Sequence, residues 1–180
     1  MSAQTTKLTG QIVTFIRWIF ESTDNIDNTL LHNFIYNDDE SLTKIKIQAG
    51  GEDDFNNVSM LPAVYTIVSK ADNMSLNPMY DYTIEVDSTD RTSGAVVDTS
   101  TAVFTILCGG ITPAQSEAIA SEIKDKLRAL KHVLPTDFDA FAIDTKQLAP
   151  PKAFDPKNPA KGYFSTVTGV VTFIDAWEVT

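Results

Sequence analysis

The order of elements along the chain predicts an α+β fold. An apolar helix comes first, a run of strands follows, one long capped helix comes next, and the chain closes on a strand. Strands and helices that do not alternate regularly favour an antiparallel sheet with helices on one face. We therefore expect one domain, residues 1–180, with a mostly antiparallel, twisted sheet of about four to six strands packed against the long helix.

The first helix is predicted over residues 8–20, "LTGQIVTFIRWIF", with Thr9 as its N-cap. Its apolar residues recur at helical spacing on one face: Ile12, Phe15, Ile16 and Ile19. Further apolar residues fall outside this face: Val13, Trp18 and Phe20. A helix that is apolar around much of its circumference is buried on two sides or meets another subunit.

The middle of the chain has the patterns of several strands. Residues 30–35 either end a short second helix or begin a strand. The segment "TKIKIQ" alternates as a half-exposed strand does, and "LPAVYTIV" is an apolar, β-branched run with Pro62 at its first residue. Two further strands, "YDYTIEVDS" and "AVVDTSTAVFTILCGG", flank the hairpin-like connection "TDRTSG".

The long helix is predicted over residues 113–133. Thr112 is its N-cap, Pro113 occupies the first helical position, and Gln115 completes a capping box. One stripe is apolar and faces the sheet: Ile119, Ile123, Leu127 and Leu130. The sequence also places Glu122 and Lys126 one turn apart, where opposite charges attract.

A Pro-rich segment at about residues 145–162 separates the strand "FDAFAID" from the end of the chain. Four of its residues are prolines, half of the chain's eight. Proline lacks a backbone donor and restricts the residue before it, so we expect an extended segment without regular structure. Two interpretations stay open: an excursion on the surface, or an arm that lies along a neighbouring subunit.

The closing segment "YFSTVTGVVTFIDAWEV" alternates over residues 163–179 and predicts a long strand. Its apolar residues share one face, on the side of the long helix: Tyr163, Val167, Val171, Phe173, Trp177 and Val179. A terminal strand with a long free edge needs a partner, because unpaired backbone groups invite aggregation.

The charge of the chain argues against a nucleic-acid-binding protein. The formal net charge is −10, whereas gripping phosphates requires clustered Lys and Arg. Acidity favours solubility, and it would equally let DNA slide past without sticking. Two acidic clusters are interpreted either as solvated turns or as a negative wall lining a pore: Asp38, Asp39, Glu40 and Glu52, Asp53, Asp54.

The sequence contains no motif that predicts an enzyme. Nucleophile-elbow, P-loop, dinucleotide-binding and zinc-protease patterns are absent, and we expect no catalytic, cofactor-binding or metal-ligating residue. Cys108, the single cysteine, is expected in the core, and a single cysteine excludes an internal disulfide. We see neither a secretory signal nor an apolar run long enough to cross a membrane.

Four stretches together resemble the tail terminator proteins of long-tailed bacteriophages, and more broadly the head–tail connector, neck and tail-completion proteins. They are the leading helix "IVTFIRWIF", the strand "LPAVYTIV", the pair "AVFTILCGG" and "TPAQSEAIASEIKDKLRAL", and the closing strand "GYFSTVTGVVTFIDAWE". The family is defined by this order of elements. The chain departs from shorter members in its length and in "LAPPKAFDPKNPAKG".

The resemblance implies a structural virion protein that is made in the host cytoplasm and forms a ring, usually a hexamer, at the head-proximal end of the tail. Such a ring stops growth of the tail tube, and possibly of the sheath, joins the tail to head-side connector proteins, and lets DNA pass. The acidic clusters would then face the lumen. Residues expected at subunit interfaces are Trp18, Phe20, Pro150, Pro151, Phe154, Pro156, Pro159, Tyr163 and Trp177. An acidic adaptor that binds a partner through an edge strand is the alternative.

Overall fold

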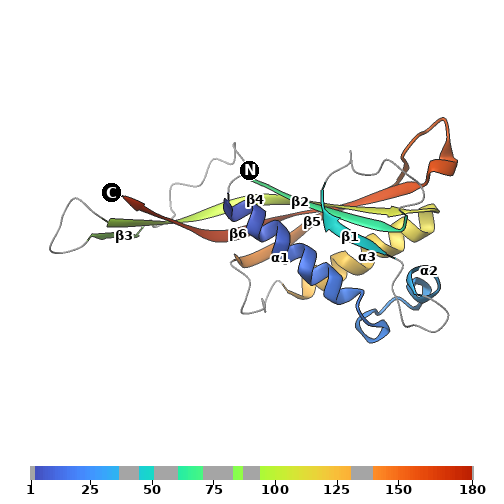
Figure 1. Cartoon of the computed structure of the whole chain (residues 1–180), viewed down its shortest axis with the longest axis horizontal. Coiled ribbons are helices and arrows are strands. Elements are labelled where there is room, and N and C mark those ends of the chain that lie inside the picture. The colour runs from blue at the N-terminus through green and yellow to red at the C-terminus, as the bar shows by residue number, and fades with distance from the viewer. Residues whose placement is uncertain are drawn as a thin grey trace.

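The computed structural model describes residues 3–36, 45–50, 61–70, 83–86, 94–130 and 140–179. These residues form an α+β fold with helices on one face of a single sheet (Figure 1). In chain order the elements are α1 Ala3–Ile19, η1 Thr23–Asn25, η2 Thr29–Leu31, α2 His32–Ile35, β1 Lys46–Ala49, β2 Ala63–Lys70, β3 Thr83–Val86, β4 Gly94–Gly110, α3 Pro113–Ala129, β5 Ala140–Ala153, η5 Pro159–Lys161 and β6 Tyr163–Val179.

The sheet has six strands in the order β1-β2-β4-β6-β5, and β3 pairs with β4 beyond the end of β2. The pairing of β1 with β2 is parallel and the other pairings are antiparallel, so the expected fold class is confirmed. β4 and β6 pair along their entire lengths, from Gly94 opposite Val179 to Gly110 opposite Tyr163. This is the longest strand pairing of the described sheet.

The closing strand β6 is not an edge of the sheet over most of its length. β4 flanks it on one side, and β5 pairs with its first part as far as Phe173. The alternation of β6 is confirmed, because Val167 and Val171 are fully buried in the main core. The partner that the second edge of the terminal strand needs is therefore β5, along residues 163–173.

β5 corrects the interpretation of the Pro-rich segment. Residues 145–153, expected without regular structure, form the second part of this strand and pair with β6. Three irregularities interrupt the ladder, and Pro150 and Pro151 lie within the last one, between Ala149 and Lys152. Proline is tolerated at bulges and on edge strands, where no ladder donor is lost. Only residues 154–162 leave the sheet.

The main core lies between the helices and one face of the sheet. Helix α3 contacts β4, β5 and β6, whereas α1 contacts β1, β2 and α3. The predicted stripe of α3 is confirmed, since Ile119, Ile123 and Leu127 are fully buried. Thr112 caps this helix by accepting the Gln115 N–H at 3.2 Å, and the Gln115 side chain accepts the Ile111 N–H at 2.7 Å, one residue before the expected partner.

Helix α1 begins five residues earlier than predicted, at Ala3, so the expectation that Thr9 caps it is wrong. Thr9 lies inside the helix, where its buried hydroxyl accepts the Val68 N–H at 3.2 Å. The pairing of β1 with β2 ends at Ala49 opposite Thr66. Thr9 therefore supplies an acceptor to β2 just where the neighbouring strand stops.

The segment after α1 is fastened to α3. Residues 29–35 are helical, which resolves the alternative between helix and strand. The buried carboxylate of Glu122 accepts the N–H groups of Asp27 and Asn28 at 3.0 and 3.2 Å. Lys126 lies 3.8 Å from Glu122, as its spacing predicted, and 2.9 Å from Asp27. This cluster holds the η1–η2 segment against the middle of the long helix.

Candidate functional site

Three strands extend beyond the body of the molecule and form an arm, defined here by β3, residues 94–100 of β4 and residues 173–179 of β6. Figure 1 shows the arm projecting past the ends of α1 and α3. Within the described part of the chain, residues 174–179 pair with β4 alone, because β5 reaches only Phe173. At about 3.3 Å per residue the projection measures about 20 Å.

The register of the arm pairs apolar residues across its strands. Ile84, Val96 and Trp177 are cross-strand partners, and the next row contains Val86 and Val179. The arm therefore continues the backbone ladder of β3, β4 and β6 beyond the described helices.

The arm is also acidic. Its three stretches contain four carboxylates and neither Lys nor Arg: Glu85, Asp98, Asp175 and Glu178. Asp98 and Asp175 are direct cross-strand partners in the register of β4 with β6. Like charges directly opposite each other destabilise a sheet.

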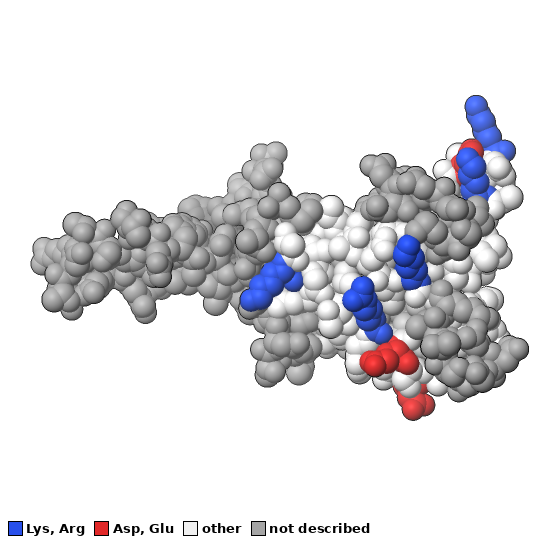
Figure 2. Space-filling view, in the orientation of Figure 1, with Lys and Arg blue, Asp and Glu red and all other residues white. Residues whose placement is uncertain are grey.

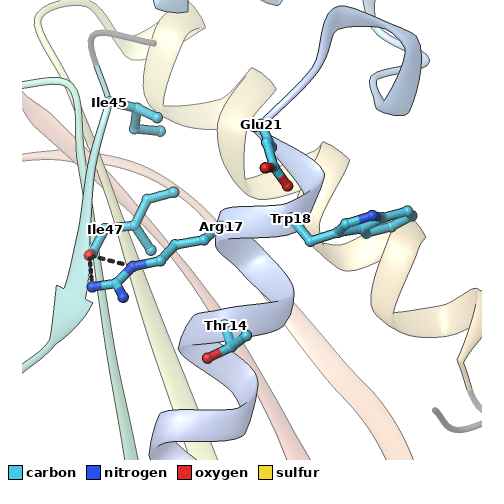
Figure 3. A pocket seen from close by; sticks show the side chains of 6 residues that line it. All are labelled: Thr14, Arg17, Trp18, Glu21, Ile45 and Ile47. Atoms are coloured by element: carbon cyan, nitrogen blue, oxygen red, sulfur yellow. Dashed lines mark hydrogen bonds between the residues drawn. The ribbon is translucent and has the colours of Figure 1, made fainter. Parts of the chain in front are cut away.

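A shallow pocket with a volume of about 620 Å³ lies on the body of the molecule, between α1 and the outer strand β1. We call it the α1–β1 surface, and it is lined by Thr14, Arg17, Trp18, Glu21, Ile45 and Ile47. In Figure 3, Arg17 reaches toward β1, whereas Trp18 projects to the opposite side of α1. The surface thus crosses the exposed ridge of the helix.

Arg17 protects the outer edge of β1. Its Nε and Nη2 atoms donate to the carbonyl oxygen of Ile47 at 3.3 and 3.0 Å. The Lys46 N–H donates to the Pro62 carbonyl and the Gly50 N–H to the Thr66 carbonyl. The backbone N–H and C=O of Ile47, between them, therefore point away from β2. A charged side chain over an edge strand satisfies its backbone and hinders unspecific pairing.

Trp18 is the large aromatic residue exposed on this surface. Its side chain is 49% exposed and stacks on Phe15, with ring centroids 5.7 Å apart. Lys7, Arg17 and Lys46 are exposed as well, and Figure 2 shows basic side chains spread over this face, with acidic ones at its lower edge and beside basic ones at the upper right. The α1–β1 surface therefore combines an exposed aromatic group with one cation, Arg17, and one carboxylate, Glu21.

The turn between β5 and β6, residues 154–162, is held by its own contacts. Phe154 stacks on Phe164 at 5.1 Å, and its N–H donates to the Gly162 carbonyl at 3.1 Å. Asp155 accepts the Lys157 N–H at 2.9 Å and pairs with Lys161 at 3.1 Å, and these bonds hold the pKa of its carboxyl below the usual range. This compact turn differs from the extended segment without regular structure that the prolines predicted.

Gly162 anchors that turn to the sheet. Its φ of 95° is a conformation that other residues rarely adopt, and a Cβ atom here would lie 2.5 Å from the Leu61 side chain and 2.8 Å from the Gly110 carbonyl.

The residues proposed for subunit interfaces divide into groups. Phe20 is fully buried in the core, so the proposal that it lies at an interface is wrong for this chain. Trp18 is exposed, and Trp177 belongs to the arm. The others lie at the end of the sheet away from the arm, either exposed (Pro150, Pro156, Pro159) or half-buried (Pro151, Phe154, Tyr163). They do not gather with Trp18.

The acidic residues expected in a lumen all lie outside the described residues: Asp38, Asp39, Glu40, Glu52, Asp53 and Asp54. Among the residues that are described, no group of three or more His, Cys, Asp or Glu side chains is placed to hold a metal ion. Burial raises the pKa of the Cys108 thiol, as expected for an inert core residue. In that same part of the chain, no helix is long and apolar enough to span a membrane.

Comparison with protein-family models and with curated proteins finds no match to this chain. The candidate site therefore rests on geometry. Sequence reasoning missed the role of Arg17 and the pairing of the strands in the arm. The alternation of residues 83–86 and 94–97 indicates two strands, but only the register shows which of their residues are partners.

Proposed function

We propose that this protein is a structural subunit of a bacteriophage virion. It forms a ring at the head-proximal end of the tail, terminates growth of the tail tube and joins it to the head-side connector. The observation that carries the proposal is the arm, whose three paired strands extend past the described helices of the chain. A protein whose function lies in contacts with copies of itself needs such a surface.

Three further features support the proposal. The fold is α+β with the order of elements on which the resemblance to tail terminator proteins rests. The outer strand β1 and the outer strand β5 both lie at the ends of the described strand order, where lateral contacts form. The net charge of −10 suits a ring through which DNA passes without being held.

The proposal is tested by the assembly state of the purified protein. Light scattering across a concentration series, alone and with purified tail tubes, measures the mass, and electron microscopy shows the shape. Six copies of 19.8 kDa give a ring of about 119 kDa. We expect rings in solution or at the ends of tubes. A monomer at every concentration, with no binding to tubes, would refute the function.

The position of β1 favours a second candidate, an acidic adaptor that binds an extended segment of a partner along this outer strand. An adaptor of this kind stays monomeric and does not bind tail tubes. Its binding should depend on β1 and not on the arm. Ile47→Pro, which removes the Ile47 N–H from the edge, would therefore abolish that binding. The same scattering experiment therefore separates the two candidates.

A further inference from the structure

We propose that the face of the sheet opposite the helices is an interface on which two copies of this chain stack. We call it the second face, and its central residues are Ile67 of β2, Thr101, Val103 and Thr105 of β4, and Thr166, Thr168, Val170 and Thr172 of β6. The inference goes beyond the proposed ring function and does not rest on it. The occupant of the second face is the same face of a second copy.

Burial alternates along β4 and β6 and separates the two faces of the sheet. On β4, Phe104 is fully buried in the main core, whereas the next residue, Thr105, is partly exposed. β6 repeats the pattern, because Val167 and Val171 are fully buried and Thr168 between them is partly exposed. Helices α1 and α3 both lie on the first of these faces (Figure 1). The second face is therefore the side of the sheet that these helices do not cover.

The second face is apolar over much of its length. It begins in a separate apolar cluster at the end of the sheet away from the arm, formed by Ala63, Tyr65 and Leu107 with Leu61 and Phe164 packed against them. The register continues this cluster along the strands, since Ile67 lies two residues beyond Tyr65 and Val103 is the direct partner of Val170. A sheet with apolar residues on both faces needs a packed layer on each of them.

Charged residues on this face occur only on the outer strands. Along β2, β4 and β6, the described residues that face this way are uncharged from Thr101 to Gly109 and from Phe164 to Thr172. The cross-strand partners on the outer strands include charged and amide side chains: Lys46 and Gln48 on β1, and Asp144, Gln147 and Lys152 on β5. An apolar centre inside a polar rim is the anatomy of a protein interface.

The properties of this face favour a second copy as its occupant. The chain has a formal net charge of −10, so two copies repel each other least where they meet through an uncharged surface. Threonine and valine are both β-branched and similar in size, so their rows stand at an even height. Two such faces can pack on each other as the sheets of a β-sandwich do, about 10 Å apart.

The area is sufficient for a specific contact. Strands about 4.8 Å apart, with a rise of about 3.3 Å per residue, give residues 101–109 and their partners on β2, β6 and β5 about 500 Å² of surface. Two copies stacked on this face would together bury about 1,000 Å², the area at which specific protein interfaces begin.

Two copies that share the same face are related by a two-fold axis. Residues near this axis lie opposite their own counterparts. Thr105 and Thr168 are direct cross-strand partners in the middle of the second face, so we expect Thr168 close to Thr168 of the second copy. A two-fold contact is closed, and it therefore adds to a ring contact formed elsewhere on the subunit without replacing it.

Cross-linking of a single variant, Thr168→Cys, tests the contact. The native Cys108 is fully buried and stays unreactive in the folded chain. After treatment with a short bis-maleimide we expect a covalent dimer, and alkylation of the new thiol should slow as the protein concentration rises. Thr14→Cys, on the exposed side of α1, is the matched control. It should give no dimer and should react at a rate that does not depend on concentration.

Light scattering across a concentration series provides a second measurement, since two copies of 19.8 kDa give 39.6 kDa. Thr168→Asp places two like charges opposite each other at the centre of the contact and should raise the dissociation constant at least about tenfold. Thr168→Val keeps the shape of the side chain and should not raise it. Thr14→Asp is the control for added charge and should leave association unchanged. Circular dichroism verifies that each variant is folded.

The outcomes separate this inference from the ring function. A chain that stays monomeric, or a dimer that Thr168→Asp does not weaken, would overturn the inference. So would a Thr168→Cys thiol that is unreactive even in dilute protein, because another segment of the same chain would then cover the face, or one that cross-links to tail-tube protein instead. Rings that lack the Thr168→Cys product overturn the inference and leave the ring function intact. A dimer with this product but without rings or tube binding supports the inference and refutes the ring function.

Discussion

Replacing Glu122 tests how the segment after α1 is attached to the long helix. The Glu122 side chain is 4% exposed, and its two carboxylate oxygens accept the N–H groups of Asp27 and Asn28. Lys126 stands 3.8 Å from it. A change at this one side chain therefore removes the acceptors for two backbone donors at once.

The expected cost follows from the contacts. A hydrogen bond to a charged group contributes about 1.5–3 kcal/mol, and a buried donor left without a partner costs about 1–3 kcal/mol. The Asp27 side chain is 83% exposed, so water can reach its neighbourhood and the lower values apply. We expect Glu122→Ala to lower the free energy of unfolding by about 3 kcal/mol, and Glu122→Gln, which keeps one acceptor, by about half as much.

The measurement is urea denaturation followed by circular dichroism, at matched protein concentration and assembly state. A loss of about 3 kcal/mol lowers the Tm by about 6–12 °C for a chain of this size. Hydrogen exchange should accelerate locally at the Asp27 and Asn28 amides. Glu117→Ala, on an exposed face of the same helix, is the control and should change stability by less than about 0.5 kcal/mol. If Glu122→Ala behaves like this control, the attachment of the segment through Glu122 is wrong.

Three further predictions concern the core. Gly169→Ala should destabilise the fold by about 1–3 kcal/mol, because a Cβ here would lie 2.5 Å from the Asp144 carbonyl oxygen and closer still to the Phe104 ring; thermal denaturation measures it, and an unchanged Tm would contradict the packing. Cys108 should react with a thiol reagent only on unfolding, so labelling in native buffer at the rate of a free thiol would place it outside the core. Burial, and secondly the charge of Glu122, raises the pKa of Tyr36 to about 12, above its ordinary value of 10.0. The folded state then holds this proton more tightly than the unfolded state, and stability is lost as the pH rises from about 10 to 12; Tyr36→Phe should lose less over that range, and equal slopes for both proteins would refute the shift.

Local patterns predicted much of the fold. The cap at Thr112, the apolar stripe of α3 and the alternation of β6 follow from contacts within a few residues, which the sequence displays directly. The interaction of Glu122 with Lys126 was visible for the same reason. Its more important contacts, to residues nearly a hundred positions away, were not visible.

The candidate site could be predicted only in part. The exposed Trp18 was identified as an interface residue from the apolar circumference of α1, but the same reasoning included Phe20, which is fully buried. Both residues are large and apolar, so hydrophobicity alone does not distinguish a core residue from an interface residue. Only packing decides which one faces another element of the same chain and which one is left for a partner.

The sequence by itself determined the α+β class, the long helix and the length of the closing strand, because hydrophobic period and caps act over one or two turns. The tertiary structure decided which strands became neighbours. It drew Pro150 and Pro151 into β5, placed Thr9 against Val68, and aligned Ile84, Val96 and Trp177 in one row. These are pairings between distant segments, and their energies depend on a register that no single segment contains.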